Sequence, residues 1–226
     1  MKCLLCKEEL SEEMMISELL FGKKKHWVCE MCLEQFEKIE GEICLGCSKK
    51  SQENYCQDCL EWKKIYPKYD FSHKALFHYN EAMQNYIERY KFFGDYRLRF
   101  IFQKEILQNL KVYKGKILIP IPLSNNRMEE RRFNQVEGLL DAAGVNYFPC
   151  LEKKIDEEKQ SSKNRKQRIS TNNPFLLKEN AKRVIENQEI VLVDDIYTTG
   201  RTLFHAYESL LSANPKSVES FSLVRA

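Results

Sequence analysis

The sequence of 226 residues contains no long hydrophobic run. A helix that spans a bilayer needs roughly 18 to 20 consecutive apolar residues, and no stretch approaches that length. The first ten residues, MKCLLCKEEL, also lack the apolar core of a secretory signal peptide. We therefore expect a cytoplasmic protein that is not an integral membrane protein, and that reaches the inner face of the membrane only through partners.

A strong excess of one charge is missing as well. The net charge is only +3, far from the balance of a dedicated basic DNA-binding domain. The charge is unevenly spread, because residues 1–70 carry 11 basic and 14 acidic side chains whereas residues 71–226 carry 25 and 19. The second part is therefore the one expected to contact polyanions.

Cysteine is abundant only at the start of the chain, where eight of the nine cysteines form four CxxC pairs. Two sulfurs from one tight turn can bind a single zinc ion, which accepts four thiolates in a tetrahedron. Disulfides need an oxidising compartment, and redox CxxC motifs seldom occur in fours. We predict two zinc sites, with ligands Cys3, Cys6, Cys29, Cys32, Cys44, Cys47, Cys56 and Cys59.

The grouping of the four pairs stays open at the level of sequence. Sequential use joins the first two and the last two pairs, whereas a cross-braced arrangement joins first with third and second with fourth. The short gap between Cys47 and Cys56 favours sequential use, as in a double zinc ribbon. Four thiolates leave no open position on the metal, so both sites are predicted to be structural. Because they add negative charge, residues 1–66 are expected to dock proteins, and Leu60 to Asp70 is expected to be a linker.

The stretch EIVLVDDIYTTGRT, residues 189–202, combines a buried-strand pattern with a polar turn. Its apolar β-branched run is typical of a strand covered on both faces of a parallel sheet. Asp194 and Asp195 follow at the carboxyl end of that strand, where open α/β sheets bind ligands. The turn then runs into a predicted helix over 203–212, and its hydroxyls and amides suit a phosphate. The simpler alternative is that the threonines only cap the helix.

VLVDDIYTTGRT resembles the phosphoribosyl pyrophosphate (PRPP) motif of type I phosphoribosyltransferases, in the form carried by the ComF family of competence proteins. The resemblance implies that Asp194 and Asp195 hold the ribose hydroxyls and act in catalysis, and that Mg²⁺ accompanies PRPP. It implies a 5′-phosphate site made by Thr198, Thr199, Gly200, Arg201 and Thr202. The predicted fold is α/β: a small zinc-ribbon domain (1–66) followed by a phosphoribosyltransferase-like parallel sheet (71–226).

Two further stretches resemble the same family: ALFHYNEAMQNYIERYKFFGDYRL and IPIPLSNNRMEERRFNQ. In the second, the resemblance implies a pyrophosphate site at Ser124 and Arg127. Many such families have a glycine before Phe-Asn-Gln, where this chain has Arg132. The candidate DNA contacts are basic residues from both stretches and from the charged segment 151–178: Lys91, Arg131, Arg132, Lys163, Arg165, Lys166 and Arg168. The alternatives are a solvated helix face for the arginines, and for the segment a loop that closes over the reaction centre or plain disorder.

The rest of the chain predicts alternating strands and helices. Strands are expected over 72–79, 116–122 and 217–224, and helices over 81–93 and 96–110, with Asn80 as the N-cap of the first helix. A turn entering a helix is expected over 123–133.

Three functions are compatible with the sequence. The resemblance implies a competence factor that helps single-stranded DNA enter the cytoplasm with a ComFA-type helicase/ATPase. An active phosphoribosyltransferase with an unknown acceptor is the second. A PRPP-sensing adaptor without chemistry is the third.

Overall fold

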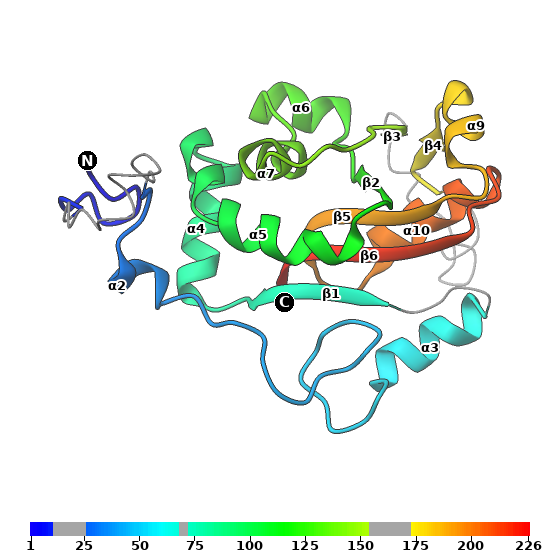
Figure 1. Ribbon diagram of the computed structural model, residues 1–226, viewed down its shortest axis with the longest axis horizontal. Helices are drawn as coiled ribbons and strands as arrows, with labels where there is room; N and C mark the ends of the chain where they lie inside the picture. The colour runs from blue at the N-terminus through cyan, green and yellow to red at the C-terminus, as the bar shows by residue number, and fades with distance from the viewer. Residues whose placement is uncertain (11–25, 68–71, 154–172) are drawn as a thin grey trace, which may run out of the picture.

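A four-stranded parallel sheet forms the centre of the molecule (Figure 1). The computed structural model describes residues 1–10, 26–67, 72–153 and 173–226. The strands are β1 (His73–His78), β2 (Ile117–Pro120), β5 (Glu189–Tyr197) and β6 (Ser217–Arg225), in the order β1-β6-β5-β2. Ile190 of β5 pairs with Val218 of β6, and Ile119 of β2 pairs with Leu192 of β5. The predicted parallel α/β sheet is thus confirmed.

Helices cover both faces of this sheet. Alternate residues of β5 point to opposite faces, so this strand contributes side chains to two cores. Val191 and Val193 belong to a core shared with α4 (Glu81–Lys91), α5 (Gln103–Leu110) and α7 (Gln135–Ala143). Ile190 and Leu192 belong to a second core, shared with α10 (Arg201–Leu211). The continuous apolar run of β5 is explained by this double coverage.

The remaining elements are short. They are α2 (Glu30–Leu33), α3 (Gln57–Ile65), α6 (Asn125–Arg131), α9 (Lys182–Ile185), the 3₁₀ turns η1 (Tyr96–Phe100), η2 (Lys111–Tyr113) and η3 (Glu179–Ala181), and the antiparallel pair β3 (Leu151–Lys153) and β4 (Phe175–Leu177). No helix among the described residues has the length and apolar character needed to cross a membrane.

Three local predictions need correction. The helix expected over 96–110 is broken into η1 and α5, because apolar spacing alone does not distinguish a 3₁₀ turn from an α-helix. The expected linker after residue 60 is wrong as far as Ile65, because α3 continues to that residue. The charged segment 151–178 begins and ends in paired strands, β3 and β4, anchored by the buried Leu151 and Phe175. Its centre, with Lys163, Arg165, Lys166 and Arg168, lies outside the described residues.

The cysteine-rich region packs against the sheet domain. Backbone hydrogen bonds join Ile39 N to Leu76 O at 2.9 Å and His78 N to Glu37 O at 2.8 Å, along the free edge of β1. The Phe36 ring meets the Phe102 ring edge-on, with centroids 4.9 Å apart. These contacts prevent the edge of β1 from pairing with a strand of another molecule. The boundary between residues 66 and 71 stays a prediction.

Candidate functional site

The acid pair, Asp194 and Asp195, lies near the carboxyl end of β5 and is almost fully buried. Asp195 N donates to Asp194 Oδ1 at 2.9 Å, which fixes the first carboxylate against the backbone. Lys91, the last residue of α4, reaches across the site and places its Nζ 2.5 Å from Asp195 Oδ2. One buried cation therefore faces two buried carboxylates.

The protonation of the acid pair follows from this imbalance. Burial raises the pKa of Asp194 to about 7, and the neighbouring charge of Asp195 acts in the same direction. The Lys91 ammonium opposes both effects but does not cancel them. The protonation of Asp194 therefore changes near neutral pH.

The phosphate turn, residues 198–202, follows β5 and leads into α10. Thr198, Thr199 and Thr202 are exposed, so their hydroxyls face solvent at the start of an eleven-residue helix. Gly200 has φ +80°, and a Cβ there would lie 2.3 Å from Tyr197 Oη. Glycine is required at this position both by backbone conformation and by space. Thr199 Oγ1 accepts a hydrogen bond from Arg201 N at 3.4 Å, and the positive end of α10 favours an anion at this turn.

The segment after β2 approaches the same edge of the sheet. Ile121 N donates to Val193 O at 2.9 Å, which sets the following residues beside the acid pair. Ser124 is buried at the N-cap of α6, yet its hydroxyl makes no capping hydrogen bond. Arg127 is exposed on α6, in the helix turn that follows. The predicted pyrophosphate residues thus begin a helix at the rim of the site.

Two arginines at the end of α6 have different environments. Arg131 donates from Nη1 to Gln135 Oε1 at 3.0 Å, and its guanidinium lies 5.3 Å from the Phe92 ring centroid. Arg132 has φ +63°, a left-handed conformation that favours glycine. The glycine expected from the family resemblance therefore has a conformational reason, and this chain places a strained arginine there instead.

Sequence reasoning missed three aromatic residues around the site. Phe92 and Phe93 follow Lys91 and are 70% and 73% exposed, although the apolar pattern indicated a helix face through Phe93. Trp62 Nε1 donates to Thr199 O at 2.8 Å, across 137 residues of sequence. The exposed phenylalanines were detectable as two adjacent aromatics beside a glycine, but no local pattern could have revealed the Trp62 contact.

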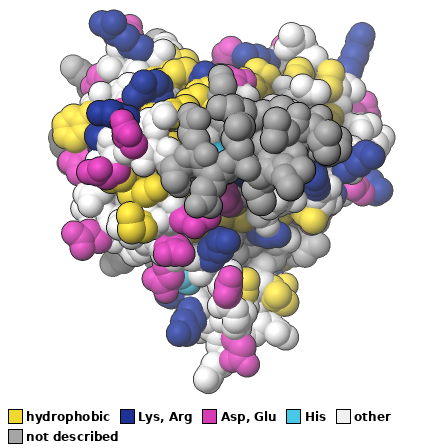
Figure 2. All heavy atoms as spheres, turned by 60° about the vertical axis from the view of Figure 1, so that its left-hand side comes forward, with side chains coloured by type: hydrophobic (Ala, Val, Ile, Leu, Met, Phe, Trp, Pro, Cys, Tyr) yellow, Lys and Arg dark blue, Asp and Glu magenta, His cyan; other side chains and the backbone are white. Residues whose placement is uncertain are grey.

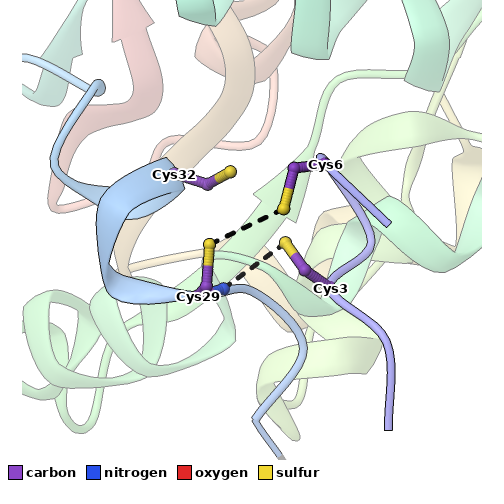
Figure 3. A group of neighbouring side chains, drawn as sticks. All are labelled: Cys3, Cys6, Cys29 and Cys32. Carbon is purple, nitrogen blue, oxygen red and sulfur yellow. Dashed lines mark hydrogen bonds between the residues drawn. The ribbon is translucent and has the colours of Figure 1, made fainter. Parts of the chain in front are cut away.

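The cysteines form two separate clusters in sequential order. Cys3, Cys6, Cys29 and Cys32 point toward one another in the first (Figure 3). Cys44, Cys47, Cys56 and Cys59 form the second. Within each cluster the sulfurs lie within 4.8 Å of one another, and all nine cysteines are free of disulfides.

The cluster geometry fits zinc. Four thiolates at about 2.3 Å from one zinc ion lie roughly 3.8 Å apart in a tetrahedron. Cys6 Sγ and Cys29 Sγ are 3.8 Å apart, and Cys47 Sγ and Cys56 Sγ are 3.6 Å apart. The donor sets are therefore suited to two structural zinc ions, and the sequential grouping is the one observed.

The structure brings some predicted site residues together and leaves others apart. Lys91 faces Asp195, while Ser124 and the phosphate turn follow β2 and β5 at the same sheet edge. Arg127, Arg131 and Arg132 lie on or after α6, and of these Arg131 interacts electrostatically with Asp195. Lys91 is only 12% exposed, so its side chain belongs to the site rather than to the outer surface.

Comparison with known proteins identifies the family to which the chain is similar. Residues 146–226 match the family described as "Phosphoribosyl transferase domain". A "Competence protein ComFC" of Streptococcus pneumoniae (strain ATCC BAA-255 / R6) is 42% identical over 226 residues, covering 100% of both chains. A second one, from Bacillus subtilis (strain 168), is 34% identical over 99% of this chain and 95% of its own.

The likeness to solved structures is weaker. A hypoxanthine phosphoribosyltransferase from Staphylococcus aureus is 19% identical, with a TM-score of 0.34, and the match covers 56% of this chain and 62% of that chain. The full-length relatives are the stronger finding, because each spans the cysteine clusters, the acid pair and the phosphate turn together. The chain belongs to the ComFC competence proteins and carries a phosphoribosyltransferase domain.

Proposed function

We propose that the protein handles single-stranded DNA during natural transformation, in the cytoplasm and together with a ComFA-type helicase/ATPase. In this proposal the acid pair and the phosphate turn bind PRPP or another 5′-phosphorylated ribose. The observation that carries it is the acid pair at a strand end, followed at once by a glycine-dependent turn that opens a helix. Family membership supplies the link to competence.

Each part of the ligand has a chemical counterpart in the site. The phosphate turn offers hydroxyls and the N-terminus of α10 to a 5′-phosphate. The acid pair accepts hydrogen bonds from vicinal ribose hydroxyls, since ionised carboxylates are acceptors only. Ser124 and Arg127 begin the helix suited to the pyrophosphate. Asp195 must exchange Lys91 for the ligand, because Lys91 Nζ already faces its Oδ2.

Mg²⁺ suits the same carboxylates. Asp195 Oδ2 is buried and faces Lys91 Nζ, so a hard cation would have to displace the lysine from this oxygen. When bound, Mg²⁺ would neutralise pyrophosphate charge. The two four-cysteine clusters are assigned to structural zinc and leave no position for a substrate.

Contacts to single-stranded DNA are assigned to the turn after α4 and the end of α6. Phe92 and Phe93 offer two exposed rings, and Arg131 lies over the first of them. The turn is held in place on one side by Lys91 and on the other by Asp95, whose carboxylate accepts from Arg89 Nη2 at 3.1 Å. Exposed rings beside guanidinium groups can stack unpaired bases without regard to sequence.

Calorimetric titration with PRPP, with and without Mg²⁺, tests the ribose phosphate site. The intact protein should bind PRPP more tightly with Mg²⁺ present. Asp195→Asn should weaken binding by at least about tenfold, because a hydrogen bond to a charged group contributes roughly 1.5–3 kcal/mol. Asp141→Asn, on the outer side of α7, is the matched control. No PRPP binding by the intact protein would refute the site, and release of pyrophosphate that depends on an added acceptor would instead favour an active transferase.

Binding of fluorescent oligothymidine and of an abasic strand of equal length tests the DNA assignment. Phe92→Ala with Phe93→Ala should weaken oligothymidine binding by at least about fivefold, since stacking contributes roughly 1–3 kcal/mol per base. Affinity for the abasic strand should not change. Val112→Ala, equally exposed on η2, is the control. Equal losses for both strands would contradict base stacking.

A further inference from the structure

Trp62 connects the second cysteine cluster to the phosphate turn. It lies on α3, and its indole Nε1 donates to Thr199 O at 2.8 Å. The indole also stacks on Phe204 of α10, with centroids 4.1 Å apart and planes at 20°. Tyr66 continues the stack, with its ring 5.3 Å from the ring of Phe204 and nearly parallel to it. One tryptophan thus contacts both the turn and the helix that the turn begins.

The hydrogen bond from Trp62 fixes the direction of a peptide group. None of the described peptide bonds is cis. In a trans peptide the carbonyl and the following N–H point in opposite directions. Because Thr199 O points to the indole on α3, the Gly200 N–H points away from α3. The space beside Gly200 is filled as well, because a Cβ there would lie 2.3 Å from Tyr197 Oη and 3.0 Å from Phe204 Cε2.

Trp62 is a major link between α3 and this turn. A cavity of about 260 Å³ lies beside this contact, lined by Glu61 and Trp62 of α3 and by Tyr197, Thr198 and Thr199. The start of α3 is fixed independently, because Cys56 is its N-cap and Cys56 N donates to Cys44 Sγ at 3.2 Å. The indole therefore spans a gap from a firmly held helix to an exposed turn.

We propose that Trp62 is a positioning residue for the phosphate turn, holding the Gly200 amide in the orientation that receives a 5′-phosphate. This inference rests on the proposed ribose phosphate site, and it names the residue that orients one of the amides in that site. It assigns the second cysteine cluster a role in ligand binding, since the cluster fixes the helix that carries the indole. A purely structural Trp62 would need only its stacking on Phe204.

Trp62→Phe separates these roles, because phenylalanine keeps an aromatic ring but cannot donate the hydrogen bond. The probes are ribose 5-phosphate, which uses the phosphate turn, and pyrophosphate with Mg²⁺, which does not. Trp62→Phe should weaken ribose 5-phosphate binding by about five- to tenfold, the effect of one lost hydrogen bond. Pyrophosphate binding should be unchanged. Trp27→Phe is the matched control, since Trp27 stacks on Phe100 instead.

A spectroscopic readout comes from the same pair of variants. The chain has two tryptophans, so Trp62 is the only indole left in Trp27→Phe. Ribose 5-phosphate should shift its emission, whereas pyrophosphate should not.

The outcomes separate this inference from the proposed function. Unchanged ribose 5-phosphate affinity in Trp62→Phe would overturn the positioning role while leaving the ribose phosphate site in place. Equal loss of both ligands with a lower melting temperature would also overturn it, because it would indicate a structural role only. Failure of the intact protein to bind either ligand would overturn the proposed site itself, and the positioning role with it.

Discussion

Two carboxylates that are buried next to each other do not readily ionise together, because burial and mutual repulsion both disfavour the second negative charge. Asp194 and Asp195 are such a pair. Lys91 contacts Asp195 and leaves Asp194 with the raised pKa of about 7. Stability should therefore depend on pH through Asp194. An unfolded Asp loses its proton near pH 4, so the folded state is penalised increasingly as pH rises from about 4 to about 7.

Asp194→Asn should remove this penalty, because the amide cannot ionise but keeps an oxygen for Asp195 N. Relative to the natural chain, we expect the variant to gain on the order of 2 kcal/mol more stability at pH 8 than at pH 5. Urea unfolding at both pH values measures the difference, with Asp141→Asn as control. An equal gain at the two pH values would show that Asp194 does not titrate in this range.

Arg132 is a second residue that lowers the stability of the fold, in this case through its backbone conformation. Its left-handed conformation, φ +63°, costs a non-glycine residue on the order of 1 kcal/mol. Arg132→Gly should stabilise the chain by about that amount in denaturant unfolding. Arg127→Gly, on the exposed part of α6, should instead cost about 1 kcal/mol. If Arg132→Gly also destabilised, contacts of the arginine side chain would have to outweigh the strain.

At the scale of elements, each cysteine cluster is joined to a different part of the site. Leu4, beside the first cluster, accepts from Arg89 Nη2 at 2.8 Å, and Arg89 lies on the helix that carries Lys91. The second cluster holds the start of α3, which carries Trp62. The two halves of the proposed ligand site are thus held by separate parts of the N-terminal region.

This division predicts different effects of losing each cluster. Cys59→Ser should weaken ribose 5-phosphate binding by about tenfold through α3, whereas Cys6→Ser should change it by less than about twofold. Zinc content, measured by mass spectrometry, should fall from two ions per chain to one in both variants. Equal effects of the two substitutions on ribose 5-phosphate binding would contradict separate bracing.

Strong local signals account for the elements that could be predicted from sequence. The apolar run of β5 indicated a strand covered on both faces, and Asn80 caps α4 by accepting from Met83 N at 3.0 Å. The three-residue strands β3 and β4 are too short to show alternation. They arise from pairing with each other across the charged segment, which composition does not encode.

The acid pair and the turn were predictable as a motif, but their partners were not. Lys91 was singled out by resemblance, yet its ion pair with Asp195 depends on how α4 crosses the sheet. Trp62 stood in a charged stretch that indicated a linker, so nothing nearby suggested a partner such as Thr199. Long-range pairings of this kind are decided by tertiary packing rather than by local propensity.

At the scale of the whole molecule, the N-terminal region contributes to both cores. Leu4 and Phe36 belong to the core under α4 and α5, and Cys44, Cys47 and Cys59 belong to the core under α10. The face shown in Figure 2 carries acidic and basic side chains interspersed, with hydrophobic ones between them.

Residues 71–226 alone should be less stable than the full chain, because the N-terminal region contributes side chains to both cores. Removing residues 1–70 uncovers Phe77 and Phe102 and exposes the edge of β1, so we expect the melting temperature to fall by at least about 10 °C. Calorimetry of the isolated segment against the full chain measures the change. An unchanged melting temperature would support two independent domains divided between residues 66 and 71.

The position of β6 between β1 and β5 has a consequence for how the protein is made. β6 is synthesised after β1, β2 and β5, and it is the strand that joins the two halves of the sheet. Until it arrives, β1 has no parallel neighbour, and β5 is paired only with β2. A chain whose translation stops before residue 217 would therefore contain both cysteine clusters. It could not complete the sheet that carries the proposed ligand site.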